Sequence, residues 1–280
     1  MITYFNGAFI PFEDVSVSPF DRGFLFADGV YESIRIYNNK LFKYDEHLTR
    51  LKRSLNETQI IYNDLEKLES VIYKLIKKNN VDEEALIYLQ ITRGSSILRT
   101  HSFPEEDIEP TVFISASPFE TEKQEQKYGI KVSLQDDMRW MRCDIKSVSL
   151  LPIVLANQKA KEAGAEEAIL VRDGLITEGT HTNFFAVKDN VIYTAPVSHY
   201  ILAGITRGVV IELANDLNIH VKEESIKEKD LKTFNECFIT STTKEVTPVV
   251  QLDDWIINDG KTGNVTTELQ NAFSKLTENC

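Results

Sequence analysis

Apolar and polar positions alternate along the first part of the chain with the two-residue period of β-strands. Residues 2–10 carry strand-forming side chains on both sides of Asn6-Gly7, a dipeptide that favours the positive φ angles of a tight hairpin turn. Residues 30–42 repeat this pattern around Asn38-Asn39 and place Tyr31 near the start of a strand. The chain is therefore predicted to begin with two hairpins.

A helical period follows these strands. Leucines recur at three- and four-residue spacing in residues 45–55, and a second amphipathic helix over residues 65–76 has Asp64 at its expected N-cap. Further strands are predicted at 85–92 and 111–117. The loop between them, residues 93–110, is long for a compact domain and is therefore a candidate functional segment.

Residues 119–128 are charged and show neither period, so we place an interdomain linker there, between domains at 1–118 and 129–280. In the second domain, Pro152 suits the first turn of a helix that ends at Gly164. The other predicted elements are a strand at 130–134, hairpin turns at Asp173-Gly174 and Asp189-Asn190, an amphipathic helix at 206–217 with Leu217 inward, strands at 237–240 and 254–259, and a helix at 266–276. These patterns predict a two-domain α+β protein.

Composition narrows the possible functions. The 280 residues suffice for two buried cores, and a net charge of -12 argues against a nucleic-acid partner because no basic domain would neutralise phosphates. No basic-then-apolar leader opens the sequence and no apolar run reaches the roughly 20 residues that span a bilayer, so we expect a cytoplasmic protein without membrane contact. The wide spacing of Cys143, Cys237 and Cys280 predicts free buried thiols and no metal site.

Lys146 stands among aromatic and apolar residues and precedes the apolar run 148–155. Two interpretations of this lysine remain open. It is either a solvated surface charge, or an amine whose pKa is lowered by desolvation and by the nearby cations Arg139 and Arg142. Such an amine could form a Schiff base with a carbonyl compound such as pyridoxal phosphate.

Two segments combine groups that bind phosphate. In Gly204-Ile205-Thr206 a glycine leads into a helix N-terminus, where unpaired amides and the helix dipole attract an anion. The alternative is that Thr206 is an ordinary N-cap. The four hydroxyls of residues 240–243 follow an apolar strand and form either a second phosphate site or a polar loop. The Gly-Lys-Ser/Thr signature of nucleotide hydrolases is missing.

Candidate acidic and cationic side chains for binding a cofactor or a substrate lie elsewhere in the chain. Glu178 ends a predicted strand just before a glycine, where it is either a solvated turn carboxylate or an acid that keeps a pyridine nitrogen protonated. Arg99 and His101, in the long loop, share one side of an extended segment. They form either a mobile charged surface or a trap for a substrate carboxylate, with Tyr31 as a possible third donor.

Taken together, these motifs resemble the fold type IV pyridoxal-phosphate enzymes, and among them the D-amino-acid aminotransferases. The motifs are Tyr31, His47-Leu48-Thr49-Arg50-Leu51, Arg142-Cys143-Asp144-Ile145-Lys146-Ser147, Glu178-Gly179 with Asn183, Gly204-Ile205-Thr206-Arg207 and Ser241-Thr242-Thr243. The resemblance extends from the first hairpin to about Phe273. It implies a smaller N-terminal α/β domain and a larger C-terminal pseudo-barrel domain that binds the cofactor.

The resemblance also implies a role for each matching position. Lys146 would form the Schiff base with pyridoxal 5'-phosphate and then shuttle the proton of the substrate Cα. Glu178 would bind the pyridine nitrogen, and Leu202 would support the face of the ring. The phosphate would be held by Arg50, Ile205, Thr206 and Thr242, and Ser241 would also bind the cofactor.

Substrate recognition follows from the same resemblance. Arg99 and His101 would reach across from the partner subunit of a homodimer and bind the substrate α-carboxylate together with Tyr31. Two features depart from the family pattern: the loop from Thr92 to Arg99 is one residue longer, and His181 stands where relatives commonly carry serine. His181 is either a solvent-facing variant or a residue that adjusts the surroundings of the cofactor.

The implied reaction is a ping-pong transfer of an amino group from a D-amino acid, such as D-alanine or D-glutamate, to a 2-oxo acid, such as 2-oxoglutarate or pyruvate. A branched-chain L-amino-acid aminotransferase and aminodeoxychorismate lyase are alternatives of the same fold. They share Lys146 and Glu178, whereas the Arg99-x-His101 pair favours D-amino acids. A catalytically silent binding protein would be expected to have lost Lys146 or Glu178.

Overall fold

The computed structural model describes residues 1–81, 83–105 and 107–280, and contacts along the chain divide it into two compact units. Unit 1 comprises Met1–Glu120, Ile145–Ser149 and Cys280, and unit 2 comprises Thr121–Asp144 and Leu150–Asn279. The segment that carries Lys146 therefore packs with unit 1. The predicted linker at 119–128 stays a prediction, and part of that segment forms helix α4.

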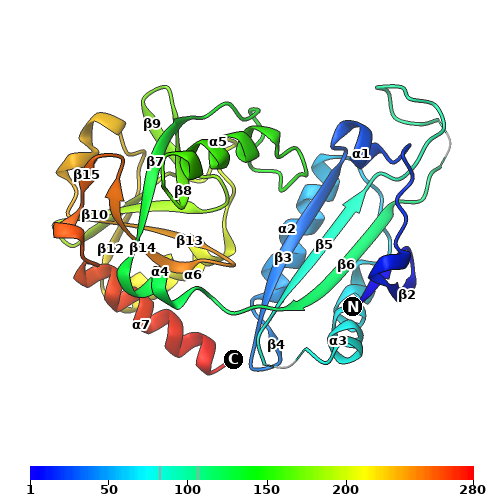
Figure 1. Cartoon of the computed structure of the whole chain (residues 1–280), viewed down its shortest axis with the longest axis horizontal. Coiled ribbons are helices and arrows are strands. Elements are labelled where there is room, and N and C mark those ends of the chain that lie inside the picture. Colours follow the sequence, from blue (N-terminus) through cyan, green and yellow to red (C-terminus); the bar gives the residue numbers. More distant parts are fainter. Residues whose placement is uncertain (82, 106) are drawn as a thin grey trace. The chain divides into compact units, whose positions relative to one another are not determined.

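Unit 1 contains an antiparallel sheet whose described strands follow the order β2-β1-β6-β5-β3-β4 (Figure 1). Positive φ angles at Asn6-Gly7 and Asn38-Asn39 close the hairpins β1–β2 and β3–β4, which confirms the turn predictions. The strands are β1 (Ile2–Phe5), β2 (Ala8–Pro11), β3 (Gly29–Tyr37), β4 (Lys40–Leu41), β5 (Ala85–Thr92) and β6 (Thr111–Pro118). The helices are α1 (Arg22–Phe26), α2 (Tyr44–Glu57) and α3 (Leu68–Asn79).

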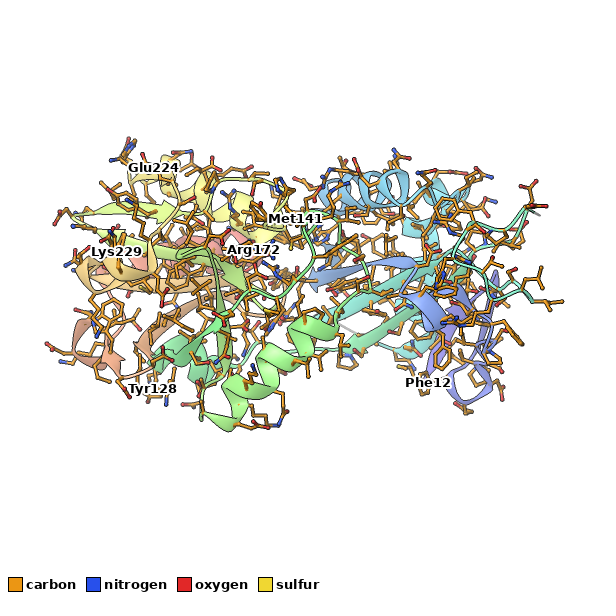
Figure 2. All side chains as sticks on the ribbon, turned by 90° about the horizontal axis from the view of Figure 1, so that it is seen from above. Phe12, Tyr128, Met141, Arg172, Glu224 and Lys229 are labelled. Atoms are coloured by element: carbon orange, nitrogen blue, oxygen red, sulfur yellow. The ribbon has the colours of Figure 1, made fainter. Side chains whose placement is uncertain are left out.

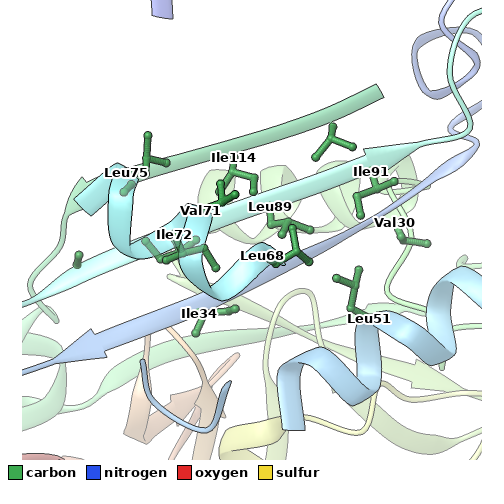
Figure 3. Packing of buried hydrophobic residues seen from close by; sticks show 14 of the residues in the cluster. Val30, Ile34, Leu51, Leu68, Val71, Ile72, Leu75, Leu89, Ile91 and Ile114 are labelled. Carbon is green, nitrogen blue, oxygen red and sulfur yellow. The ribbon is translucent and has the colours of Figure 1, made fainter. Parts of the chain in front are cut away.

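Helices α2 and α3 cover one face of this sheet (Figure 3). Leu51 of α2 and Ile72 of α3 pack with Ile34 of β3 and Leu89 of β5, and all four side chains are buried. Because strand residues alternate between faces, Tyr31 of β3 lies on the opposite face, where its ring meets that of Tyr88. The helix-covered face thus holds the core, and the other face remains accessible to a functional side chain.

Unit 2 is a mixed sheet of strands in the order β12-β11-β10-β13-β14-β7-β8-β9, with β15 paired to β14 (Figure 1). The strands are β7 (Ile130–Asp136), β8 (Glu167–Arg172), β9 (Leu175–Gly179), β10 (Asn183–Lys188), β11 (Val191–Thr194), β12 (His220–Glu223), β13 (Glu236–Ser241), β14 (Glu245–Leu252) and β15 (Trp255–Ile256). The sheet curls, so that β9 at its end approaches β10 again. This arrangement confirms the predicted α+β class with a pseudo-barrel in the second half.

The helices of unit 2 are α4 (Lys123–Tyr128), α5 (Leu151–Glu162), α6 (Ile205–Asp216) and α7 (Asn264–Glu278). Pro152 lies in the first turn of α5, and Gly164 takes a positive φ of 68° just beyond its end, both as predicted. Positive φ angles at Asp173-Gly174 and Asp189-Asn190 close the hairpins β8–β9 and β10–β11. The local turn signals in the sequence were therefore sufficient to place these elements.

Two helix details were predicted wrongly. Asp64 does not cap α3, because the 3-10 turn Leu65–Lys67 intervenes and the Asp64 carboxylate pairs with Lys67 at 2.7 Å. Leu217 does not point inward, because α6 ends at Asp216 and the backbone then turns through a positive φ at Asn218. Leu217 is exposed, and Ala214 is buried in the last turn.

Among the residues described, no helix is long and apolar enough to cross a membrane. The same residues contain no group of three His, Cys, Asp or Glu side chains arranged to hold a metal ion. Cys143, Cys237 and Cys280 carry free thiols, and Cys280 is only partly buried, in contrast to the expectation for all three.

Candidate active site

The residues predicted to form the site fall into two sets. Unit 1 contains Tyr31, Arg50, Arg99, His101 and Lys146, and unit 2 contains Glu178, Leu202, Ile205, Thr206, Ser241 and Thr242.

Lys146 is held against β3 by its backbone. Its carbonyl oxygen accepts a hydrogen bond of 3.0 Å from the amide of Tyr31, and its own amide donates to Ser54 Oγ of α2 at 3.3 Å. Lys146 Nζ lies 4.2 Å from the centre of the Tyr31 ring, which is within cation–π distance. Two residues predicted to act together, Lys146 and Tyr31, are therefore in direct contact.

Arg50 of α2 is fixed by an acid on the helix-covered face of β3. Glu32 is buried and accepts hydrogen bonds of 2.8 Å from Arg50 Nε and Nη2 and a third of 2.8 Å with His47 Nδ1. Burial would raise the pKa of Glu32, but the Arg50 charge and these hydrogen bonds lower it to about 2. The guanidinium is thus held rigidly by a permanently charged carboxylate.

Arg99 and His101 lie in the exposed loop and flank one aromatic side chain. The guanidinium of Arg99 is 5.0 Å from the centre of the Phe26 ring, and the ring of His101 is 5.5 Å from it. The predicted same-side arrangement of this pair is consistent with these contacts. For Tyr31, the described contacts are with Lys146 and Tyr88.

A buried arginine anchors this loop to α1. Arg22 Nη1 donates to the carbonyl oxygen of Thr100 at 2.9 Å and Nη2 to that of His101 at 3.5 Å. Arg22 Nε pairs with Asp28 at 2.9 Å, and the same carboxylate pairs with Arg93 at 2.7 Å. Arg22 and Asp28 were not recognised in the sequence, because their partners are about 70 residues away or lie in an irregular loop.

Glu178 is the acid at the centre of the unit 2 set. It lies in β9, is 5% exposed and accepts hydrogen bonds from the guanidinium of Arg139, from Asn183 Nδ2 at 3.0 Å and from the Leu202 amide at 3.1 Å. Burial raises the pKa of Glu178 to about 7, although Arg139 and the Leu202 amide oppose this shift. The solvated-turn interpretation of Glu178 is therefore excluded.

The predicted phosphate segment next to Glu178 begins α6. Gly204 is the N-cap of this helix and makes no side-chain cap, so amides of the first turn remain available to an anion. Thr206 is a buried residue inside the helix, which excludes the plain N-cap interpretation. A Cβ on Gly204 would lie 2.0 Å from Asn183 Oδ1, so glycine is required by the close approach of Asn183.

The run of hydroxyls closes the hairpin between β13 and β14. Strand pairing sets Thr240 opposite Asn183, which places the end of β13 beside the strand that contacts Glu178. Ser241 Oγ accepts a hydrogen bond of 3.1 Å from the Lys244 amide and lies 3.4 Å from Thr243 Oγ1. The buried hydroxyl of Thr240 has no hydrogen-bond partner within the described part of the chain. The predicted residues of unit 2 therefore gather at neighbouring strand ends.

The sequence indicates Arg139 only as a cation near Lys146. The structure pairs it with Asp137 at 2.8 Å and with Glu178, and it pairs Arg142 with Asp144 at 3.0 Å. Both arginines are thus neutralised by carboxylates.

His181 Nδ1 lies 3.0 Å from the buried Glu167, and the His181 side chain is 43% exposed.

The groups present fit pyridoxal phosphate. Unit 2 offers a buried acid for a ring nitrogen and a glycine-led helix terminus with available amides for a phosphate. Unit 1 offers the Lys146 amine, which lies beside the Tyr31 ring, and the Arg50 guanidinium, which is held by Glu32. These groups suit amino-group chemistry on a substrate bound to a carbonyl cofactor.

Comparison with known proteins agrees with this chemistry. Residues 29–252 match the family model described as amino-transferase class IV, so the chain belongs to the class IV aminotransferases. It is 43% identical over 276 residues to D-alanine aminotransferase of Staphylococcus aureus (strain N315), covering 98% of this chain and 97% of the relative. It is 44% identical over 278 residues to D-alanine aminotransferase of Bacillus licheniformis, with 98% and 97% covered.

Solved structures share the fold. A branched-chain amino acid aminotransferase from Escherichia coli superimposes with a TM-score of 0.92 at 28% identity, covering 99% of this chain and 95% of that one. The branched-chain aminotransferase of the thermophilic archaeon Thermoproteus uzoniensis, solved with norvaline, gives a TM-score of 0.88 at 25% identity, covering 100% and 95%. A further branched-chain enzyme, solved with pyridoxamine 5'-phosphate, gives a TM-score of 0.90 at 27% identity, covering 99% and 94%. The resemblance to fold type IV aminotransferases inferred from the sequence is confirmed.

Proposed function

We propose that this class IV aminotransferase transfers the amino group of a D-amino acid, such as D-alanine or D-glutamate, to a 2-oxo acid, such as 2-oxoglutarate or pyruvate. The observation that carries the proposal is the identity of 41–44% with D-alanine aminotransferases along nearly the whole chain. The branched-chain enzymes that share the fold are 25–28% identical. The cofactor is pyridoxal 5'-phosphate.

When bound, pyridoxal phosphate supplies a pyridine ring that takes up the electron pair left at the substrate Cα. In this chain the Lys146 amine would hold the cofactor through its carbonyl group, and Nζ would remove the Cα proton and return it. The contact with the Tyr31 ring and the backbone bonds to Tyr31 and Ser54 support this role, because they fix the lysine in one position.

The remaining residues hold the cofactor and the substrate. Glu178 binds the ring nitrogen, and its three donors support this role because they fix the carboxylate. Leu202 would support the ring, Arg50, Ile205, Thr206 and Thr242 would hold the phosphate, and Ser241 would also bind the cofactor. Tyr31, Arg99 and His101 bind the substrate α-carboxylate, since a guanidinium, an imidazole N–H and a hydroxyl can donate hydrogen bonds to its oxygens.

A half-reaction tests the substrate assignment. D-alanine or D-glutamate, added without a 2-oxo acid, is expected to bleach the absorbance of the bound cofactor, whereas L-leucine leaves it unchanged. The opposite pattern would replace the D-amino-acid assignment with that of a branched-chain L-amino-acid aminotransferase. Lys146→Ala is expected to abolish both the visible absorbance band of the wild-type protein and its bleaching.

We also propose a homodimer in which Arg99 and His101 serve the partner's site. An exposed apolar patch supports it: Phe20, Phe24, Ile97 and Leu98 are 45%, 76%, 85% and 71% exposed. The Ser96 amide donates to the Phe20 carbonyl at 3.4 Å, so the patch joins the loop to the segment before α1. Exposed apolar groups of this kind are typical of surfaces that a partner covers.

Mixing two inactive variants tests this sharing. If Arg99 acts in the partner's site, a mixed dimer of Arg99→Ala and Lys146→Ala subunits contains one site with both residues intact, and activity returns. If Arg99 acts in its own subunit, every site in the mixture lacks either Arg99 or Lys146, and the mixture stays inactive. Cytoplasmic action and the lack of nucleic-acid or membrane partners stay predictions.

A further inference from the structure

Four alternating charges lie in a row in unit 2. Arg172 Nη2, on the side chain labelled in Figure 2, lies 3.1 Å from Asp137 Oδ1, and Asp137 Oδ2 lies 2.8 Å from Arg139 Nη2. The guanidinium of Arg139 then donates to Glu178. The four side chains are 14%, 0%, 7% and 6% exposed in this order, so the row is shielded from solvent.

The strand arrangement explains why the row forms. Strands β7 and β8 are parallel and paired up to Asp136 and Val171, so Asp137 and Arg172 follow at the same end of the sheet. Strand β9 returns from Arg172 and carries Glu178. Arg172 also donates to the carbonyl oxygen of Arg139 at 2.8 Å, which fixes the backbone of the residue that reaches Glu178.

The orientation of Arg139 is determined by several partners. Its Nε and Nη2 donate to Asp137 at 2.9 Å and 2.8 Å, and Nη2 also donates to the carbonyl oxygen of Tyr200 at 3.1 Å. With these atoms occupied, Nη1 points to Glu178. Because Nε and Nη2 hold the planar guanidinium in place, its remaining nitrogen, Nη1, has little freedom to change direction.

The charge of Arg139 opposes the burial of Glu178. Asn183 and the Leu202 amide are neutral donors, whereas Arg139 brings a positive charge. Burial and the negative charge of Asp137 both raise the pKa of Glu178, and Arg139 lowers it. Without Arg139, only neutral donors would oppose the effects of burial and of Asp137, so the pKa of Glu178 would rise further.

We propose that Arg139 is a positioning residue that favours the ionised form of the Glu178 carboxylate and orients it for the cofactor's ring nitrogen, and that Asp137 and Arg172 hold Arg139 in place. The inference rests on the proposed role of Glu178. An ionised carboxylate accepts the hydrogen bond of a protonated ring nitrogen, whereas a protonated carboxyl can no longer stabilise that charge. Arg139 thereby acts on the reaction without touching the substrate.

The test compares the affinity of cofactor-stripped variants for pyridoxal 5'-phosphate and the pH dependence of the bound cofactor's absorbance. Arg139→Gln is expected to weaken cofactor affinity about 10- to 100-fold, as for a lost hydrogen bond to a charged group. It is also expected to shift the absorbance titration. Arg139→Lys keeps the positive charge but loses the planar set of guanidinium donors. Its cofactor affinity and absorbance titration are expected to fall between those of wild type and Arg139→Gln.

Two further variants separate the causes. Arg142→Gln removes a neighbouring arginine that pairs with Asp144 instead, and it is expected to leave affinity and absorbance within about twofold. Asp137→Asn combined with Arg139→Gln removes both charges and is expected to recover part of the affinity lost in Arg139→Gln. Recovery of this kind reports an electrostatic effect, because a purely structural loss would deepen in the double variant.

Glu178→Gln distinguishes failure of this inference from failure of the proposed function. If Glu178→Gln loses affinity and absorbance while both Arg139 variants keep them within twofold, Arg139 has no such role and the inference is overturned. If Glu178→Gln itself leaves both unchanged, the proposed role of Glu178 fails and the inference fails with it. Where Arg139→Gln does not fold, unchanged affinity and absorbance in Arg139→Lys overturn the inference.

Discussion

Glu32 of β3 accepts two hydrogen bonds of 2.8 Å from the guanidinium of Arg50 on α2. Both side chains are buried, so removing the acid would leave the cation without its charged partner in a shielded position. Glu32→Gln is therefore expected to lower the free energy of unfolding of the cofactor-free chain by about 3 kcal/mol, measured by urea denaturation. The variant is also expected to bind pyridoxal 5'-phosphate more weakly, because Arg50 loses the carboxylate that fixes the position of its guanidinium.

Lys43 and Glu46 provide a control in the same unit. They form an ion pair of 3.2 Å, and their side chains are 27% and 47% exposed. Glu46→Gln is expected to change the free energy of unfolding by less than about 1 kcal/mol, since water solvates the lysine that remains. Equal losses in Glu32→Gln and Glu46→Gln would show that burial of the Glu32 pair contributes nothing.

The stability of the cofactor-free chain should depend on the ionisation of Glu178. Burial raises its pKa from the ordinary 4.5 to about 7, so the folded chain binds this proton more tightly than the unfolded chain does. The contribution of Glu178 to stability is therefore present below about pH 4.5 and is lost as the pH rises through 7, by about 3 kcal/mol in total. Urea denaturation of wild type and Glu178→Gln from pH 4.5 to 8 measures the difference.

The difference between these two proteins isolates Glu178 from other titrating groups, which are common to both. Wild type is expected to lose stability relative to Glu178→Gln as the pH rises across this range. Parallel pH profiles for the two proteins would mean that Glu178 titrates near its ordinary value in the folded chain.

Local signals in the sequence predicted most of the elements. Asn6-Gly7 and Asp173-Gly174 adopt the positive φ angles that such dipeptides favour, and the strands on either side of them form hairpins. Pro152 likewise marks the beginning of α5. These signals succeed because each depends on the conformational preferences of one or two residues.

The contacts of the site could not be predicted in the same way. Arg139 and Glu178 are separated by 39 positions, and β3 and α2 must pack before Glu32 can meet Arg50. Periodicity places a residue on a face of its own element, but it does not say which side chain of another element lies opposite. The family motifs named Arg50, Glu178 and Asn183, whereas the contacts of Glu32 with Arg50 and of Arg139 with Glu178 gave no signal in the sequence.

Arg22 is expected to affect substrate binding through the loop. It donates to the carbonyl oxygens of Thr100 and His101, and these bonds fix the backbone of the proposed carboxylate trap. Arg22→Met is therefore expected to raise KM for D-alanine about 10-fold with a smaller change in kcat, while affinity for pyridoxal 5'-phosphate stays within twofold. Steady-state kinetics and absorbance titration measure the two effects separately.

Lys52 offers a control for the loss of a cation from unit 1, because it is exposed on α2. Lys52→Met is expected to leave KM unchanged. If Arg22→Met lowered kcat and cofactor affinity together while KM stayed constant, the bonds from Arg22 to the loop would have no part in substrate binding.

Gly204 is expected to tolerate no side chain, in contrast to Gly208 of the same helix. A Cβ on Gly204 would lie 2.0 Å from Asn183 Oδ1 and would displace Asn183, which donates to Glu178 at 3.0 Å. Gly204→Ala is therefore expected to weaken affinity for pyridoxal 5'-phosphate about 10-fold, measured by absorbance titration.

The matched change is Gly208→Ala, where the added Cβ meets nothing within 4 Å. Alanine favours the helix over glycine by about 1 kcal/mol, so this variant is expected to raise the unfolding temperature and keep full cofactor affinity. Gly204 is the N-cap of α6 and Gly208 lies inside the helix, so only Gly208→Ala gains helix propensity. The two variants are therefore compared by their cofactor affinity. If both variants kept full affinity, the close approach of Asn183 to Gly204 would have no part in orienting Glu178.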